Sequence, residues 1–162
     1  MLDIIIVSIQ SPKDLDLFQS VIKTAFSATP DADIAEWYSF DQAKASLSGK
    51  QGTAFLAKIG EQVVGAIHAQ PESPIFGREG SGKWQITNIG VVPEHQRQGI
   101  GGKLLKSVEA VAKEKLGTKA IVHTNPDDRV AVGFYIKYGY RPVGILDNYY
   151  YRGPAQFFIK QL

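Results

Sequence analysis

A glycine-rich turn between a strand and a helix is the sequence feature that most constrains this fold. The chain has 16 glycines, and seven of them fall within residues 77–102: Gly77, Gly80, Gly82, Gly90, Gly99, Gly101 and Gly102. The β-branched segment 83–92 precedes the turn, and residues 100–116 follow it with apolar side chains at helical spacing. Glycines at such a junction let the backbone approach a ligand closely. We therefore expect function to concentrate there.

Other apolar segments predict strands and helices on both sides of this junction. Short β-branched runs predict strands at residues 2–9, 53–59, 62–69, 83–92, 119–124, 141–146 and 156–161. Apolar residues at three-to-four spacing predict helices at residues 12–26, 33–47, 100–116 and 129–138. Residues 71–82 contain two prolines and three glycines, which predicts a long loop.

The order of these elements indicates the fold class. An antiparallel meander comes first and a strand–helix–strand crossover lies in the middle, so the strict alternation of a doubly wound sheet is absent. The pattern is α/β of the α+β kind, with a mixed, mostly antiparallel twisted sheet of about seven strands flanked by four helices. A chain of 162 residues buries enough surface for one core, so we expect a single domain over residues 1–162.

Composition excludes several kinds of chemistry and partner. The chain has no cysteine, which removes disulfides, cysteine zinc sites and a cysteine nucleophile. Its net charge of +2 is too small to indicate a nucleic-acid or membrane partner. The N-terminal segment lacks the charge and length of a signal peptide, and no stretch approaches the roughly 18 apolar residues that span a bilayer. We expect a cytoplasmic protein.

The turn itself, QRQGIGG, occupies residues 96–102. Backbone N–H groups at the start of a helix favour an anion such as a pyrophosphate. A Walker A loop needs Ser or Thr at position 104 and a dinucleotide motif needs glycine there, whereas the chain has Leu104. A plain strand-to-helix connection would also explain the glycines, so spacing alone leaves both interpretations open.

Two longer stretches resemble a known family. VVPEHQRQGIGGKLL (residues 91–105) resembles the acetyl-CoA-binding motif of the GCN5-related N-acetyltransferases (GNAT), and AVGFYIKYGYRPVG (131–144) resembles their later motif. The resemblance implies the GNAT fold and transfer of the acetyl group of acetyl-CoA to a primary amine. The acceptor is left open between a small-molecule amine and a peptide or protein amine. A catalytically weak acyl-CoA-binding sensor or interaction module is the alternative, because some members carry a glutamate where this chain has Gln85.

The resemblance also implies where acetyl-CoA binds, in a gap between strands 84–92 and 119–124. Backbone groups of Ile89, Gly90 and Val91 would pair with the pantetheine arm, with the Ile89 N–H facing the thioester carbonyl. The pyrophosphate would rest on the amides of Arg97, Gln98, Gly99, Ile100, Gly101 and Gly102. We expect a β-bulge at Gly90 to turn N–H groups out of the sheet toward this ligand.

Two residues are candidates for moving protons. The resemblance implies that Tyr135 protonates the leaving thiolate. His123 lies where bacterial enzymes that acetylate ribosomal-protein N-termini carry a glutamate, and a histidine titrates in the range that suits a general base. With no cysteine and no G-x-S-x-G serine, direct attack in a ternary complex is favoured over a covalent acyl-enzyme.

Other polar residues receive structural interpretations. His68 is an alternative base but is expected to be only an edge-strand residue, and His95 is expected in the turn, exposed or beside a phosphate. The three histidines lack metal-site spacing, so no metal is expected. Asp128 precedes a predicted helix and is expected to cap it, and a role beside the pantetheine stays open.

The acceptor side is the least constrained. Residues 147–151, DNYYY, resemble the tyrosine-bearing hairpin of peptide N-terminal acetyltransferases and would form one wall of an acceptor slot. Trp37 and Tyr38 are candidates for the opposite wall. Tyrosine is also a common strand residue, so a structural role is equally open. By resemblance, a homodimer is expected to be possible.

Overall fold

The computed structural model describes residues 3–27, 43–44, 52–72, 82–150 and 153–162. Several predictions fall elsewhere in the chain. All of the predicted helix 33–47 except residues 43–44 lies outside the described residues, and so do Trp37, Tyr38, Tyr151 and the segment 73–81 of the predicted loop.

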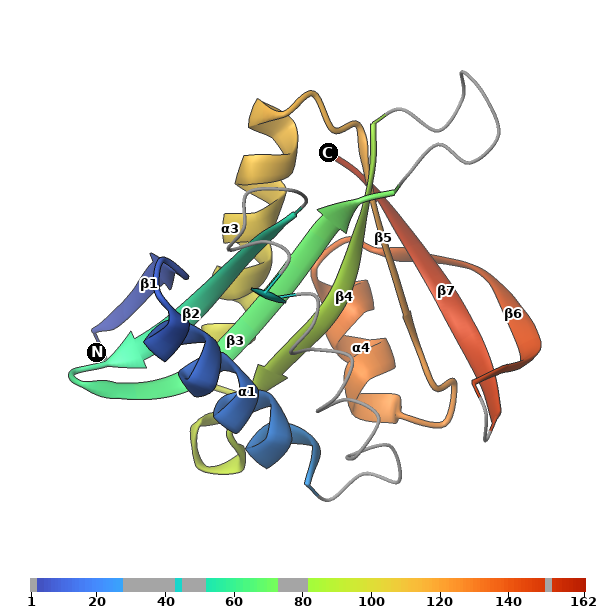
Figure 1. Ribbon diagram of the computed structural model, residues 1–162. Coiled ribbons are helices and arrows are strands. Elements are labelled where there is room, and N and C mark those ends of the chain that lie inside the picture. The colour runs from blue at the N-terminus through green and yellow to red at the C-terminus, as the bar shows by residue number, and fades with distance from the viewer. Residues whose placement is uncertain (1–2, 28–42, 45–51, 73–81, 151–152) are drawn as a thin grey trace.

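The described residues form a seven-stranded sheet at the centre of the fold, as the sequence predicts (Figure 1). Its strands, in chain order, are β1 (Ile4–Ser8), β2 (Thr53–Ile59), β3 (Gln62–Pro71), β4 (Lys83–Val91), β5 (Lys119–Thr124), β6 (Arg141–Tyr150) and β7 (Gly153–Gln161). Their order across the sheet is β1-β2-β3-β4-β5-β7-β6. Only β4 and β5 are parallel among these neighbours, so the predicted mixed, mostly antiparallel sheet is confirmed.

Three described helices cover the two faces of the sheet: α1 (Pro12–Phe26), α3 (Ile100–Glu114) and α4 (Arg129–Lys137). Figure 1 shows α1 across one face and α3 behind the other. The α4 helix lies beside α3, because Phe134 of α4 contacts the start of α3 at Gly101. None of the described helices is long and apolar enough to cross a membrane.

Helix α1 begins where the sequence predicts because its first turn is capped. Ser11 adopts an extended backbone, and its hydroxyl accepts the Asp14 N–H at 3.3 Å. The Asp14 carboxylate accepts the Ser11 N–H at 3.0 Å in return, which completes a capping box. The Gln10 N–H also donates to the Asp14 carboxylate at 3.0 Å, and these backbone hydrogen bonds, that of Gln10 first, lower the pKa of Asp14. The helix then buries Leu15, Phe18, Val21 and Ile22 against the sheet.

The predicted bulge at Gly90 is wrong, because the irregularity in β4 lies at Thr87. His68 of β3 pairs with Asn88 and Ala69 pairs with Ile86, so Thr87 has no partner in the ladder, whereas Gly90 pairs regularly with Ala66. A different constraint requires glycine at position 90. A Cβ there would lie 2.8 Å from the Ala25 Cβ and 3.2 Å from the Ile22 Cδ1, so α1 packs directly on the Gly90 backbone.

The expectation for His68 is also wrong, because β3 lies between β2 and β4 and the His68 side chain is fully buried. Its Nδ1 lies 2.6 Å from the Thr87 Oγ1, and the Thr87 hydroxyl in turn donates to the His68 carbonyl at 3.2 Å. Burial lowers the pKa of His68 to about 4, so the ring is neutral near pH 7. The neutral ring can donate its Nδ1 proton to the bulged Thr87, which holds the bulge in place.

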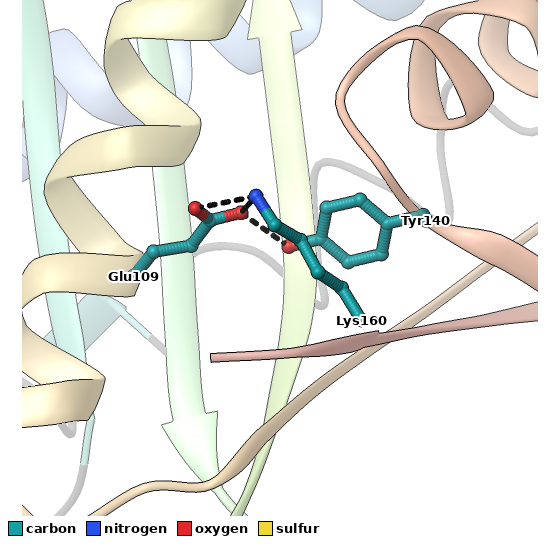
Figure 2. A network of polar contacts seen from close by, with 3 residues as sticks. All are labelled: Glu109, Tyr140 and Lys160. Carbon is teal, nitrogen blue, oxygen red and sulfur yellow. Dashed lines mark hydrogen bonds and ion pairs between the residues drawn. The ribbon is translucent and has the colours of Figure 1, made fainter.

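A buried polar network joins helix α3, strand β7 and the residue Tyr140 that follows α4 (Figure 2). The Lys160 Nζ of β7 lies 2.8 Å from each carboxylate oxygen of Glu109 in α3, and the Tyr140 hydroxyl donates to the same carboxylate at 2.9 Å. The Tyr140 backbone N–H donates to the Tyr135 carbonyl at 3.0 Å. The network therefore connects α3 and β7 to the end of α4, the helix that carries Tyr135.

The final hairpin is longer than the sequence predicts. Strand β6 continues through residues 147–150, which were expected to form a loop, and Tyr150 pairs with Gly153 at the start of β7. The pairing is irregular between Leu146 and Tyr150. Asn148 within this stretch has a φ of 54°, in the left-handed region. At this irregular end of the hairpin, Tyr149 and Tyr150 lie beside His123 of β5.

Candidate active site

The parallel strands β4 and β5 pair only near their starts. Lys83, Trp84 and Gln85 pair with Lys119, Ala120 and Ile121, and no pairing follows, although β4 continues to Val91 and β5 to Thr124. Beyond Gln85, the edge of β4 that faces β5 therefore has no strand partner. This is the place where the sequence motifs imply that acetyl-CoA binds.

The backbone N–H groups of Ile89 and Val91 point outward from this unpaired edge of β4. The Val92 N–H donates to the Val64 carbonyl at 2.9 Å, and hydrogen-bonded pairs alternate along an antiparallel ladder. Gly90 therefore bonds to Ala66 in β3, whereas the N–H groups of Ile89 and Val91 point to the β5 side. The alternation of the ladder, and not a bulge at Gly90, exposes these two groups. The Val91 carbonyl accepts a hydrogen bond from the Gln96 side chain at 3.0 Å.

The start of α3 presents free backbone donors beyond this edge. Among the described residues no side chain caps this helix, and its first intrahelical bond runs from the Lys103 N–H to the Gly99 carbonyl. The amides of Ile100, Gly101 and Gly102 precede that bond and lack an intrahelical acceptor. Gly99 has a φ of 82° and Arg97 a φ of 61°, so the turn folds back on itself before the helix begins. This arrangement suits an anion.

Two glycines of the turn also serve helix packing, which the sequence did not reveal. A Cβ at Gly101 would lie 3.0 Å from the Phe134 ring, and a Cβ at Gly102 would overlap the Tyr138 hydroxyl. Phe134 belongs to α4 and Tyr138 follows its last residue. A larger side chain at either glycine would therefore displace one of these rings, whatever the turn binds.

Tyr135 is buried, with 5% of its surface exposed. Its ring contacts Phe134, Tyr140 and Phe158, with centroids 5.3, 5.8 and 5.7 Å away. Burial raises the pKa of Tyr135, and negative charge on Tyr150 or Asp128 would raise it further. The hydroxyl therefore keeps its proton near pH 7, as a general acid must before it donates.

His123 lies at the centre of a polar and aromatic cluster. Its Nε2 is 3.2 Å from the Gln85 Nε2 and 3.4 Å from the Tyr149 hydroxyl, and its Nδ1 is 2.6 Å from the Tyr150 hydroxyl. The ring also contacts Phe157, with centroids 5.0 Å apart. Burial lowers the pKa of His123, so the ring is neutral near pH 7 and able to accept a proton.

The two proposed catalytic side chains lie on opposite faces of the sheet. Val122 of β5 pairs with Phe158 of β7, and His123 pairs with Phe157. Neighbouring residues of a strand point to opposite faces, and Tyr135 contacts Phe158 whereas His123 contacts Phe157. Tyr135 and His123 thus approach the separated ends of β4 and β5 from different sides.

Asp128 and His95 are the two remaining residues that the sequence singled out. Asp128 caps α4 as predicted, since its carboxylate accepts the Ala131 N–H at 3.0 Å. His95 is half-buried, and its Nδ1 is closed to solvent without a partner among the described residues. It lines a cavity of about 460 Å³ between α1 and the turn, with Ser20, Thr24 and Glu94. No group of three His, Asp or Glu side chains within the described residues has the arrangement of a metal site.

Gln85 and Tyr150 are the residues that the sequence did not connect to His123. Gln85 was notable only because it cannot titrate, and Tyr150 only as one of three successive tyrosines. The parallel pairing of Gln85 with Ile121 brings the Gln85 side chain beside His123. The family motif drew attention to the position of Gln85, whereas no sequence pattern indicated the contact of Tyr150 with His123.

Solved structures share this fold. The ribosomal-protein-S18-alanine N-acetyltransferase from Escherichia coli matches with a TM-score of 0.74 at 18% identity, over 98% of this chain and 94% of that one. The PaiA N-acetyltransferase from Thermoplasma acidophilum, in complex with coenzyme A, matches with a TM-score of 0.76 at 16% identity, over 99% and 100% of the chains. At these identities the likeness shows the fold alone.

Sequence relatives lead to the same family. A Bacillus subtilis protein, provisionally named ribosomal protein bS18-alanine N-acetyltransferase, is 38% identical over 41% of this chain and 44% of its own length. N-acetyltransferase 8B of Rattus norvegicus is 30% identical over 64% of this chain and 46% of its own length. The chain thus spans less than half the length of these two curated relatives. The model of the acetyltransferase (GNAT) family matches residues 16–140, and the chain belongs to this family.

Proposed function

We propose that this chain is an acetyl-CoA-dependent N-acetyltransferase that acetylates a peptide or protein amine by direct attack in a ternary complex. The observation that carries the proposal is the early end of the β4–β5 pairing at Gln85 and Ile121. It leaves backbone donors of β4 without a strand partner, between Tyr135 on one face and His123 on the other.

The residues present fit acetyl-CoA as the acyl donor. The N–H groups of Ile89 and Val91 are available to the amide groups of the pantetheine arm, which such an edge can bind as it would bind another strand. The uncapped start of α3, after Gly99, suits the pyrophosphate. The T. acidophilum structure of the same fold was determined with coenzyme A, which supports this assignment.

The reaction itself forms one bond and breaks one. The thioester supplies an electrophilic carbonyl carbon, to which the amine nitrogen bonds as the carbon–sulfur bond breaks. We assign the Ile89 N–H as the donor to the carbonyl oxygen as negative charge develops there. His123, which is neutral, takes the proton that the amine nitrogen loses, directly or through water. Tyr135 gives its proton to the departing thiolate.

A peptide amine is the favoured acceptor on two grounds. The Bacillus subtilis relative, 38% identical over its matched segment, is provisionally named for acetylating an alanine of ribosomal protein bS18. In this chain, Tyr149 and Tyr150 lie beside His123, and Tyr149 is 46% exposed, so an aromatic surface adjoins the proposed base. A tyrosine surface of this kind can contact a peptide backbone and side chain together.

The test is the release of CoA thiol from acetyl-CoA with a panel of amines. The panel contains peptides with a free N-terminal amine, the same peptides with that amine blocked and an internal lysine, and small polyamines. We expect turnover with the free N-terminal peptides and product mass at the N-terminal residue. Turnover with polyamines alone would overturn the peptide assignment. Binding of CoA without turnover across the panel would instead favour the acyl-CoA sensor, the alternative that Gln85 suggests.

A further inference from the structure

We propose that Tyr150 is a positioning residue for His123, which holds the ring in the tautomer with its proton on Nδ1 and leaves Nε2 as the basic nitrogen. This inference rests on the proposed function, because it assigns a task to the residue beside the proposed base. The Tyr150 hydroxyl lies 2.6 Å from the His123 Nδ1, the shortest polar contact of the cluster.

The environment of Nε2 determines the direction of this hydrogen bond. The Gln85 amide nitrogen, which can only donate, lies 3.2 Å from the His123 Nε2. The Tyr149 hydroxyl, which can donate or accept, lies 3.4 Å from the same nitrogen and can add a second donor to it. A nitrogen that accepts hydrogen bonds must present its lone pair, so the ring proton resides on Nδ1. The Tyr150 oxygen is then the acceptor for the Nδ1 proton.

The irregular end of β6 makes this contact possible. Successive side chains of a regular strand point to opposite faces, yet Tyr149 and Tyr150 both contact the His123 ring. The pairing irregularity between Leu146 and Tyr150, with Asn148 at a φ of 54°, removes that alternation. The local backbone thus brings two consecutive tyrosines to one histidine.

A phenol in this position has a different effect from a carboxylate. A carboxylate beside Nδ1 would favour the charged imidazolium and raise the pKa of His123. The neutral Tyr150 oxygen orients the ring without adding charge, so the effect of burial remains and the ring stays neutral near pH 7. His123 is therefore held both in one tautomer and in the form that accepts a proton.

The first test reads the tautomer directly and needs no catalysis. The chain has three histidines, so nitrogen NMR of histidine-labelled protein can resolve each ring. In the wild-type protein we expect the His123 Nδ1 to carry the proton and Nε2 to be bare. Tyr150→Phe, which keeps the ring but loses the oxygen, should move proton population to Nε2. Tyr149→Phe is the matched control and should keep the wild-type pattern, because the partner of Nδ1 remains.

Two results of the NMR test would overturn the inference: a wild-type ring protonated on Nε2, or an unchanged nitrogen pattern in Tyr150→Phe. Kinetics supply a second readout. In Tyr150→Phe we expect kcat to fall about 10- to 100-fold, the usual cost of losing the partner that orients a functional histidine, with unchanged acetyl-CoA affinity. An unchanged kcat with an active wild type would also contradict the proposal. If the wild-type protein turns over no amine, the proposed function fails, while the nitrogen signals still decide the tautomer.

Discussion

The Gly90 backbone of β4 lies so close to Ala25 of α1 that a Cβ on residue 90 would approach the Ala25 Cβ to 2.8 Å. This contact sets the distance between α1 and the strand that carries Ile89 and Val91. It also explains the glycine in the middle of the strand without reference to a ligand.

Gly90→Ala is expected to destabilise the protein by about 1–3 kcal/mol, because the added methyl group overpacks the interface between α1 and β4. The measurement is the free energy of unfolding in urea. The double variant Gly90→Ala, Ala25→Gly removes the opposing Cβ and should recover part of the loss. Equal stability of Gly90→Ala and the wild type would show that α1 does not hold its observed position.

Acidification should destabilise the fold through His68. Its pKa is lowered to about 4 in the folded protein, while the unfolded chain titrates near 6.5, so the unfolded state binds more protons between these values. Stability is therefore lost as the pH falls through this window. From His68 we expect a loss of about 2 kcal/mol between pH 7 and pH 5.

Urea unfolding at several pH values measures this dependence, and His68→Gln is the control. Glutamine can still donate to Thr87 but does not titrate, so this variant should be less sensitive to pH over the same range. If the unfolding free energy of His68→Gln falls with pH as steeply as that of the wild type, another group causes the pH dependence.

Replacement of the proposed acid should affect turnover and leave binding intact. Tyr135→Phe retains the buried ring and its contacts with Tyr140 and Phe158 but loses the hydroxyl. We expect kcat to fall about 100-fold, with little change in acetyl-CoA affinity measured by calorimetry. If Tyr135→Phe keeps the wild-type kcat, Tyr135 is not the general acid.

The pH dependence of kcat/KM should report His123. Only the neutral ring can accept a proton, and burial lowers the pKa of His123 below its ordinary value of 6.5. The limb that His123 contributes should therefore lie on the acid side, below that ordinary value, and the acceptor α-amine, with an ordinary pKa of about 8, adds a separate limb above it. His123→Gln should lose this acid limb and about 100-fold in rate. If His123→Gln keeps the same acid limb, the base is another group or water.

Local features of the fold were readable from the sequence. The start of α1 at Pro12 and the cap at Asp128 follow from side chains within a few residues of one another, and both are present as predicted. The helix around residues 100–116 was predicted about two residues too long, because Leu116, at a φ of 61°, leaves the helical conformation before Gly117. Strand β6 was predicted too short because Asp147 and Asn148 are typical of loops.

Long-range features were not readable. The insertion of β7 between β5 and β6, the bulge at Thr87 and the burial of His68 all depend on which strand pairs with which, and in what register. The candidate site shows the same division. The motifs indicated Tyr135 and His123 as candidates, but the contacts of His123 with Gln85 and Tyr150 span 38 and 27 residues of chain.

The sequence by itself determined the family, the order of the elements and the segment that turns into α3, because these depend on short motifs and local periodicity. The tertiary structure alone decided what the glycines do. Gly90 makes room for α1, and Gly101 and Gly102 make room for α4, at contacts between residues distant in the chain. It also decided which backbone groups of β4 face the gap, since ladder alternation is fixed only when β3 is paired with β4.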